Sequence, residues 1–239
     1  MLLLATDTSG RSGSIALARG DVDDNCEVIE VVSLSGGTFS AQLVPQIAAL
    51  LTKHEFGKHD IEAFAVASGP GSFTGLRIGL AAIKALAEIL QKPIASVSLL
   101  EAVAVGAKVQ GRVLALLDAG RGEVYCGEYD VSGQSALVRT ERLLKREEVF
   151  SESQRGQLPS SETQNASTGG ATLATSDQSL AEAARTARLS ISLVEAIDAG
   201  TIARIGWRKI RSGETVSPEQ LEANYVRRTD AEILAKVTS

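Results

Sequence analysis

The stretch 68–79 reads Ser-Gly-Pro-Gly-Ser-Phe-Thr-Gly-Leu-Arg-Ile-Gly and lies between an apolar run and a helical pattern. Residues 61–67 predict a buried strand, and residues 80–90 predict the continuation of a helix that starts inside the stretch. Gly75 and Gly79 are four residues apart and therefore share one helix face. Because a glycine inside a helix costs about 0.5–1 kcal/mol relative to alanine, we expect another group to approach that face closely.

That group can be a phosphate or another helix. A helix N-terminus offers free N–H groups to an anion, but a P-loop ends in Gly-Lys-Ser/Thr, and here no lysine follows before Lys84. A dinucleotide fingerprint needs an acidic residue at the end of a second strand about 20 residues further on. Neither Glu88 nor Glu101 ends a predicted strand. The residues alone therefore favour helix packing at Gly75 and Gly79.

The composition argues against several classes of protein. The chain has 239 residues, with 24 basic and 29 acidic side chains and a net charge of −5, which disfavours a broad basic surface for nucleic acid. No apolar run reaches the length of about 18 residues that a membrane span needs, and residues 1–7 lack the basic region of a signal peptide. Cys26 and Cys126 form no disulfide framework, and Cys126 is predicted to be a small core residue. These features predict a protein of the reducing cytoplasm.

The two halves of the chain begin with the same pattern. Residues 2–6 are an apolar run that ends at Asp7, and residues 113–117 are a second run that ends at Asp118. A turn with glycine and arginine follows each aspartate, and a second strand pattern follows each turn. Such a repeat indicates a duplicated domain, and strands that alternate with helical patterns indicate mixed sheets covered by helices.

We predict a first domain of residues 1–108 and a smaller, less regular second domain of residues 109–239. Residues 151–179 are rich in Ser, Thr, Gln and Gly, with few large apolar side chains. This composition predicts a flexible insertion in the second domain.

Four segments resemble the bacterial TsaB family, also called YeaZ. They are Leu-Ala-Thr-Asp-Thr-Ser at 4–9, the glycine-rich stretch at 68–79, Leu-Asp-Ala-Gly-Arg-Gly-Glu-Val-Tyr at 117–125 and Tyr-Val-Arg-Arg at 225–228. Their order and spacing match over nearly the whole chain, and residues 151–179 match least. The resemblance implies an α/β fold of duplicated ribonuclease-H-like domains, as in the actin, sugar kinase and Hsp70 superfamily, with mixed sheets and covering helices.

The resemblance also implies a function, which is formation of N6-threonylcarbamoyladenosine at position 37 of tRNAs that read ANN codons. Members of the TsaB family are catalytically inactive paralogues of the subunit TsaD and bind it. We therefore expect a TsaD-like partner, a TsaE-like ATPase in the complex and a homodimer when the chain is alone. We expect no catalytic residue, metal or cofactor in the isolated chain. A nucleotide at the interface with TsaD and direct contact with tRNA both remain open.

The histidines argue against a metal site of the kind that the catalytic relatives have. His54 and His59 are five residues apart, so they do not share a helix face, and they flank Gly57. We predict two solvated histidines at a helix end and in the following loop. Phe39 stands where many members of the family have a histidine, and an aromatic side chain there can still pack.

The hairpin aspartates have two interpretations. In ATP-using relatives they face Mg²⁺ and phosphates, whereas aspartate also stabilises turns by bonding to nearby backbone. Both roles stay open for Asp7 and its neighbours Thr8 and Ser9, and the turn role is favoured for Asp118. The alternative function is an ATP-dependent kinase or ATPase of the same superfamily. A peptidase is disfavoured because the two histidines are badly placed for a Ser-His-Asp or metal set.

The first two long helices are expected to form the partner interface. Their apolar positions extend over more than one helix face, and a surplus apolar face typically marks a partner site. The resemblance implies a four-helix bundle with two helices from each chain. The predicted interface residues are Leu43, Ile47, Leu50, Leu51, Phe73, Gly75, Leu76, Arg77, Gly79, Ala82, Ile83 and Leu86.

Overall fold

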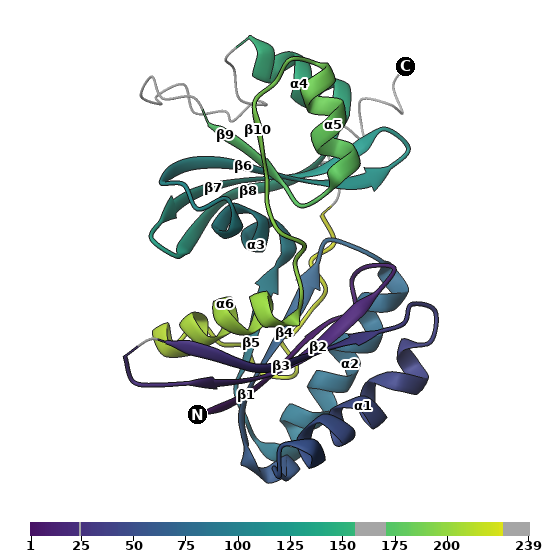
Figure 1. Ribbon diagram of the computed structural model, residues 1–239, viewed down its shortest axis with the longest axis vertical. Helices are drawn as coiled ribbons and strands as arrows, with labels where there is room; N and C mark the ends of the chain where they lie inside the picture. The colour runs from purple at the N-terminus through teal and green to yellow at the C-terminus, as the bar shows by residue number, and fades with distance from the viewer. Residues whose placement is uncertain (24, 156–170, 227–239) are drawn as a thin grey trace. The chain divides into compact units, whose positions relative to one another are not determined.

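A computed structural model describes residues 1–23, 25–155 and 171–226, which form two compact units (Figure 1). The first unit comprises Met1–Ala102 and Ile197–Asn224, and the second comprises Val103–Ala196 with Tyr225 and Val226. Each unit contains a five-stranded sheet. Within these ranges, no helix is both long and apolar enough to cross a membrane.

Strand β1 is the centre of the first sheet, whose order is β3-β2-β1-β4-β5. It pairs antiparallel with β2 and parallel with β4, while β3 extends the antiparallel side and β5 the parallel side. All residues of β1 are buried, as expected for a strand covered on both faces. The strands are β1 (Leu2–Asp7), β2 (Gly13–Gly20), β3 (Cys26–Leu34), β4 (Ile61–Gly69) and β5 (Ile94–Ser98).

The second sheet repeats this arrangement with the order β10-β9-β6-β7-β8. Strand β6 takes the place of β1, because it pairs antiparallel with β7 and parallel with β9. The shared strand order confirms the duplication that the two aspartate hairpins predicted. The strands are β6 (Gly111–Gly120), β7 (Glu123–Ser132), β8 (Ser135–Lys145), β9 (Thr172–Thr175) and β10 (Ile191–Leu193).

Two long helices lie side by side on one face of the first sheet (Figure 1). Helix α1 (Phe39–Lys53) contacts β2 and β3, and α2 (Phe73–Leu90) contacts β1 and β4. A short 3-10 helix, η1 (Lys58–Asp60), leads from α1 into β4. The apolar side chains that α1 and α2 direct at the sheet form one core cluster with those of the strands.

Helix α6 (Ala199–Ser212) covers the other face of the first sheet, although it follows β10 in the chain (Figure 1). Glycines allow the close approach. A Cβ on Gly206 would lie 2.4 Å from the Cβ of Ala65, and a Cβ on Gly20 would lie 2.3 Å from the ring of Trp207. The sequence-based division assigned every residue after 108 to the second domain, whereas these contacts place α6 in the first unit.

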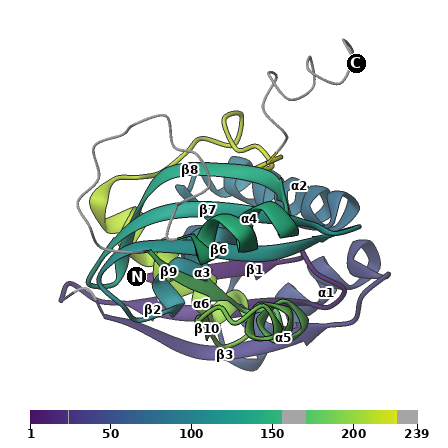
Figure 2. The ribbon, with the colours of Figure 1, turned by 90° about the horizontal axis from the view of Figure 1, so that it is seen from above.

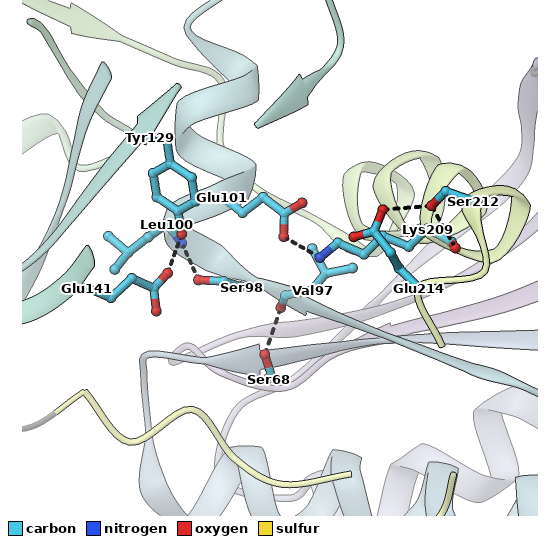
Figure 3. Close-up of polar contacts among 10 residues, drawn as sticks. All are labelled: Ser68, Val97, Ser98, Leu100, Glu101, Tyr129, Glu141, Lys209, Ser212 and Glu214. Carbon is cyan, nitrogen blue, oxygen red and sulfur yellow. Dashed lines mark hydrogen bonds and ion pairs between the residues drawn. The ribbon is translucent and has the colours of Figure 1, made fainter. Parts of the chain in front are cut away.

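A buried ion pair attaches α6 to the start of helix α3 (Leu99–Gly106) (Figure 3). Lys209 Nζ lies 2.9 Å from Glu101 Oε2, and Glu101 is 8% exposed. Burial raises the pKa of Glu101 above its ordinary value, while the charge and hydrogen bond of Lys209 lower it. The pair therefore offsets part of the cost of burying the carboxylate.

Helices α4 (Arg146–Gln154) and α5 (Gln178–Thr186) complete the second unit, with α4 against β8 and α5 against β9 and β10 (Figure 2). They share a core cluster with Cys126, which is 3% exposed. Burial raises the pKa of the Cys126 thiol to about 12. The prediction that Cys126 is a core residue is therefore confirmed.

The predicted insertion at 151–179 is partly wrong. Helix α4 continues to Gln154, β9 is hydrogen-bonded between β6 and β10, and α5 begins at Gln178. Strand β9 has four residues, two of them threonine, so its periodicity was too short to stand out from the polar composition. Residues 156–170 of the predicted insertion lie outside the described residues.

Candidate functional site

The residues at the end of β1 and the start of the β1–β2 loop form a polar cluster on the first turn of α2, closed by their own hydrogen bonds. Asp7 is buried, and its Oδ1 accepts hydrogen bonds from the Ser9 N–H at 2.9 Å and the Ser9 hydroxyl at 2.6 Å. The Thr8 hydroxyl donates to the Gly75 carbonyl at 2.8 Å, and the Ser72 N–H donates to the Ser9 carbonyl at 2.7 Å. The hydroxyls of Thr8 and Ser9 thus both donate hydrogen bonds to groups of the same chain.

The glycines of the 68–79 stretch make this closure possible. A Cβ on Gly75 would lie 2.0 Å from the Thr8 carbonyl oxygen, and one on Gly79 would lie 2.4 Å from Thr8 Oγ1. A Cβ on Gly71 would lie 2.6 Å from the Ser9 carbonyl oxygen. The group that approaches the Gly75–Gly79 face is therefore the chain's own β1–β2 loop. The prediction of helix packing at this face is wrong.

A second carboxylate near Asp7 escaped the sequence analysis. Asp198 is the N-cap of α6, and the next residue, Ala199, donates its N–H to the hydroxyl of Ser14, the cross-strand partner of Asp7. Burial raises the pKa of Asp7; hydrogen bonds from Ser9 lower it, and the Asp198 charge raises it further. No local pattern connects the two aspartates, because α6 returns to the first sheet from far along the chain.

The substitution Asp7→Asn should therefore change the free energy of unfolding in a pH-dependent way. The pKa of Asp7 is higher in the folded chain than in the unfolded chain, so ionisation of Asp7 destabilises the folded state at pH values above its folded pKa. This cost vanishes below about pH 4, because Asp7 is then protonated in both states. Asp7→Asn should raise the free energy of unfolding at pH 7 and lose this advantage at pH 3.5. Urea unfolding across this pH range measures it. Asp118→Asn is the control, and an advantage that is equal at both pH values contradicts a charge effect.

The second hairpin differs from the first. Asp118 is exposed, and its carboxylate accepts no hydrogen bond from the described residues. The turn itself is formed by three residues with positive φ, at 77° for Gly120, 55° for Arg121 and 80° for Gly122. The turn-stabilising role that was favoured for Asp118 is therefore carried by the backbone of these three residues.

The structure separates the two histidines. His54 ends α1, with its Nε2 2.7 Å from Glu30 Oε2 and its side chain 25% exposed, while His59 is exposed in η1. Their places at a helix end and in the following segment are as predicted, but His54 is paired and not simply solvated. In the described ranges, no group of three or more His, Cys, Asp or Glu is placed to hold a metal ion. Phe39 packs in the core at 6% exposure, against Gly13.

Most of the predicted interface residues belong to the core of the first unit. The buried ones are Leu43, Ile47, Leu50, Leu51, Gly75, Leu76, Gly79 and Ile83, and Ala82 and Leu86 pack against the same core. Phe73 and Arg77 are exposed, with the Arg77 guanidinium 3.7 Å from the centroid of the Phe73 ring. The prediction is wrong for the buried residues, because the apolar stripe that it selected covers the sheet.

The outward faces of α1 and α2 carry different residues, some of which are small or apolar. On α2, Ala81, Ala85 and Ile89 are exposed at intervals of four residues, and Ile89 is 70% exposed. On α1, Ala41 and Ala48 are exposed on either side of Val44, which is 56% exposed. We call these six residues the outer surface of α1 and α2. On a helical wheel with about 100° per residue, the three residues of α2 lie roughly opposite the buried side of that helix. The three residues of α1 lie about 110° from the centre of its leucine stripe.

The two sheets of identical order define a duplicated ribonuclease-H-like fold of the actin, sugar kinase and Hsp70 superfamily. A family model described as "TsaD: tRNA N6-adenosine threonylcarbamoyltransferase" matches residues 33–235. The structure "YeaZ from Pseudomonas aeruginosa" has a TM-score of 0.70 and 25% identity, and the match covers 94% of this chain and 99% of that one.

Two similar relatives carry the name "tRNA threonylcarbamoyladenosine biosynthesis protein TsaB". That of Bacillus subtilis is 38% identical over 130 residues, which span 54% of this chain and 55% of that protein. That of Escherichia coli is 38% identical over 155 residues, which span 62% of this chain and 64% of that protein. The chain therefore belongs to the TsaD family and, within it, to the TsaB/YeaZ group.

Proposed function

We propose that the chain is a non-catalytic subunit that binds a TsaD-like catalytic subunit and supports formation of N6-threonylcarbamoyladenosine at position 37 of tRNAs reading ANN codons. The observation that carries this proposal is the 38% identity to two proteins named for threonylcarbamoyladenosine biosynthesis. The site of action is the cytoplasm.

The closed β1–β2 loop supports the non-catalytic part of the proposal. A hairpin that binds phosphate or Mg²⁺ must turn hydroxyl and carboxylate groups toward its ligand. In this chain the Thr8 hydroxyl is bonded to Gly75, and the Ser9 hydroxyl and N–H are bonded to Asp7. Asp7 is itself buried, and its Oδ1 already accepts both hydrogen bonds from Ser9.

The outer surface of α1 and α2 is the proposed binding surface for the TsaD-like subunit. The exposed Val44 and Ile89 lie on two helices that contact each other, and exposed apolar side chains are typical of a protein interface. Alanines let partner helices approach closely. The same surface would form the homodimer when the chain is alone. A TsaE-like ATPase joins the complex, and any nucleotide binds at the interface with the TsaD-like subunit and not to the isolated chain.

Depletion of the chain from its host should remove N6-threonylcarbamoyladenosine from tRNA. Mass spectrometry of tRNA nucleosides measures the loss, and re-expression of the chain should restore the nucleoside. Extra copies of the TsaD-like subunit alone should not restore it, because that subunit would still lack its partner. A depleted strain with a normal amount of the modified nucleoside contradicts the proposed function.

A further inference from the structure

The turn between β6 and β7 holds an arginine in an unusual backbone conformation. Five non-glycine residues in the described ranges have positive φ. Four of them, Glu55, Gln91, Lys108 and Arg188, follow the ends of helices, where a left-handed residue commonly terminates the helix. Arg121, with φ 55°, lies instead in a β-hairpin turn between Gly120 and Gly122.

An arginine is a poor choice for this position on conformational grounds. Hairpin turns with positive φ strongly prefer Asn, Asp or Gly. In this conformation a Cβ lies too close to the following carbonyl oxygen; glycine has no Cβ, and the side chains of Asn and Asp can form a local hydrogen bond. The neighbouring turn between β7 and β8 has a glycine, Gly133, at its positive φ of 62°. The backbone at Arg121 is therefore strained, and a glycine at this position would remove the strain.

Nothing in the described part of the second unit accounts for the arginine. The Arg121 side chain is exposed and makes no hydrogen bond or ion pair with the described residues. The turn is held by its backbone, because the Arg146 N–H at the start of α4 donates to the Gly122 carbonyl at 2.9 Å. A strained, exposed residue without a structural contact is a candidate for a functional contact.

The charges around the turn favour a protein as the partner of Arg121. Exposed Asp118 lies beside the turn, and Glu123 is the cross-strand neighbour of Lys145. The surface around the β6–β7 turn therefore carries both negative and positive side chains. A surface that binds the nucleic acid backbone needs a clear excess of positive charge. A planar guanidinium matches a carboxylate in a bidentate pair.

We propose that Arg121 is an interface residue that pairs with a carboxylate of the TsaD-like subunit. The choice of this partner rests on the function proposed above. The contact comes from the second unit and is additional to the outer surface of α1 and α2. Arg121 then lowers the stability of the free chain but raises its affinity for the TsaD-like subunit. Replacing Arg121 with glycine should therefore raise the stability and lower the affinity.

Two variants separate charge from backbone strain. Arg121→Gly removes both, and Arg121→Gln removes the charge but keeps a side chain at positive φ. Calorimetric titration with the purified TsaD-like subunit should show Kd raised at least about tenfold for both variants. Thermal unfolding of the free chain should show a midpoint raised by about 2–4 °C for Arg121→Gly and little changed for Arg121→Gln.

Arg188→Gly is the matched control, because Arg188 is also an exposed arginine of the second unit, with φ 60°, at a helix end. It should raise the midpoint in the same way and leave Kd unchanged. If Arg121→Gln binds as tightly as the unmodified chain, the pairing of Arg121 with a carboxylate is overturned. If the unmodified chain itself does not bind the TsaD-like subunit, the proposed function fails first and this contact fails with it.

Discussion

Ala85→Arg is expected to abolish both self-association and binding of the TsaD-like subunit while the chain remains folded. Ala85 is exposed in the middle of the outer surface of α1 and α2, so an arginine is tolerated in the free chain. Arginine is also a good helix former. In the complex, however, its charge would be buried without a partner, at a cost of about 3–5 kcal/mol. This corresponds to a loss of affinity of more than about 100-fold.

Size-exclusion chromatography and calorimetric titration measure the two effects, and circular dichroism tests that the variant is folded. Ala183→Arg is the control, because Ala183 is a half-buried alanine on helix α5 of the second unit. It should leave both associations unchanged. A folded Ala85→Arg variant that still binds the TsaD-like subunit would place the interface elsewhere on the chain.

Gly75→Ala should unfold the first unit or destabilise it by more than about 3 kcal/mol. The added methyl group would lie 2.0 Å from the Thr8 carbonyl oxygen, which is backbone and cannot rotate away. Relief requires the β1–β2 loop to move off α2, which breaks the hydrogen bond from Thr8 to the Gly75 carbonyl. Overpacking of this kind typically costs 1–3 kcal/mol, occasionally more, and the lost buried hydrogen bond adds to it.

Urea unfolding compares this variant with Gly57→Ala. A Cβ on Gly57 would meet nothing closer than the Asp60 carboxylate at 3.6 Å, and the Gly57 φ of −96° suits any residue. Gly57→Ala should therefore change the free energy of unfolding by less than about 1 kcal/mol. A Gly75→Ala variant as stable as Gly57→Ala would show that the loop does not dock on α2 as described.

The interface prediction shows what hydrophobic periodicity can and cannot determine. The leucine stripe of α1 and the Gly75–Gly79 face of α2 were correctly recognised as faces that touch something. Periodicity does not state whether that partner belongs to the same chain, and here it is the first sheet and the β1–β2 loop. The outward alanines were overlooked because small exposed residues give a weak signal in a hydrophobicity pattern.

Local sequence determined the elements that depend on neighbouring residues. The two aspartate hairpins and the duplication, the strand, turn and helix around stretch 68–79, and the burial of Cys126 follow from patterns of a few residues. The resemblance to TsaB came from the same segments, because motifs are read along the chain.

The tertiary structure decided the features that join distant segments. The return of α6 to the first sheet, the Glu101–Lys209 pair and the approach of Asp198 to Asp7 connect parts of the chain that no local pattern relates. The raised pKa of Asp7 likewise depends on burial from several elements. An amphipathic helix specifies that one face must be covered, but which sheet covers it depends on how the whole chain packs.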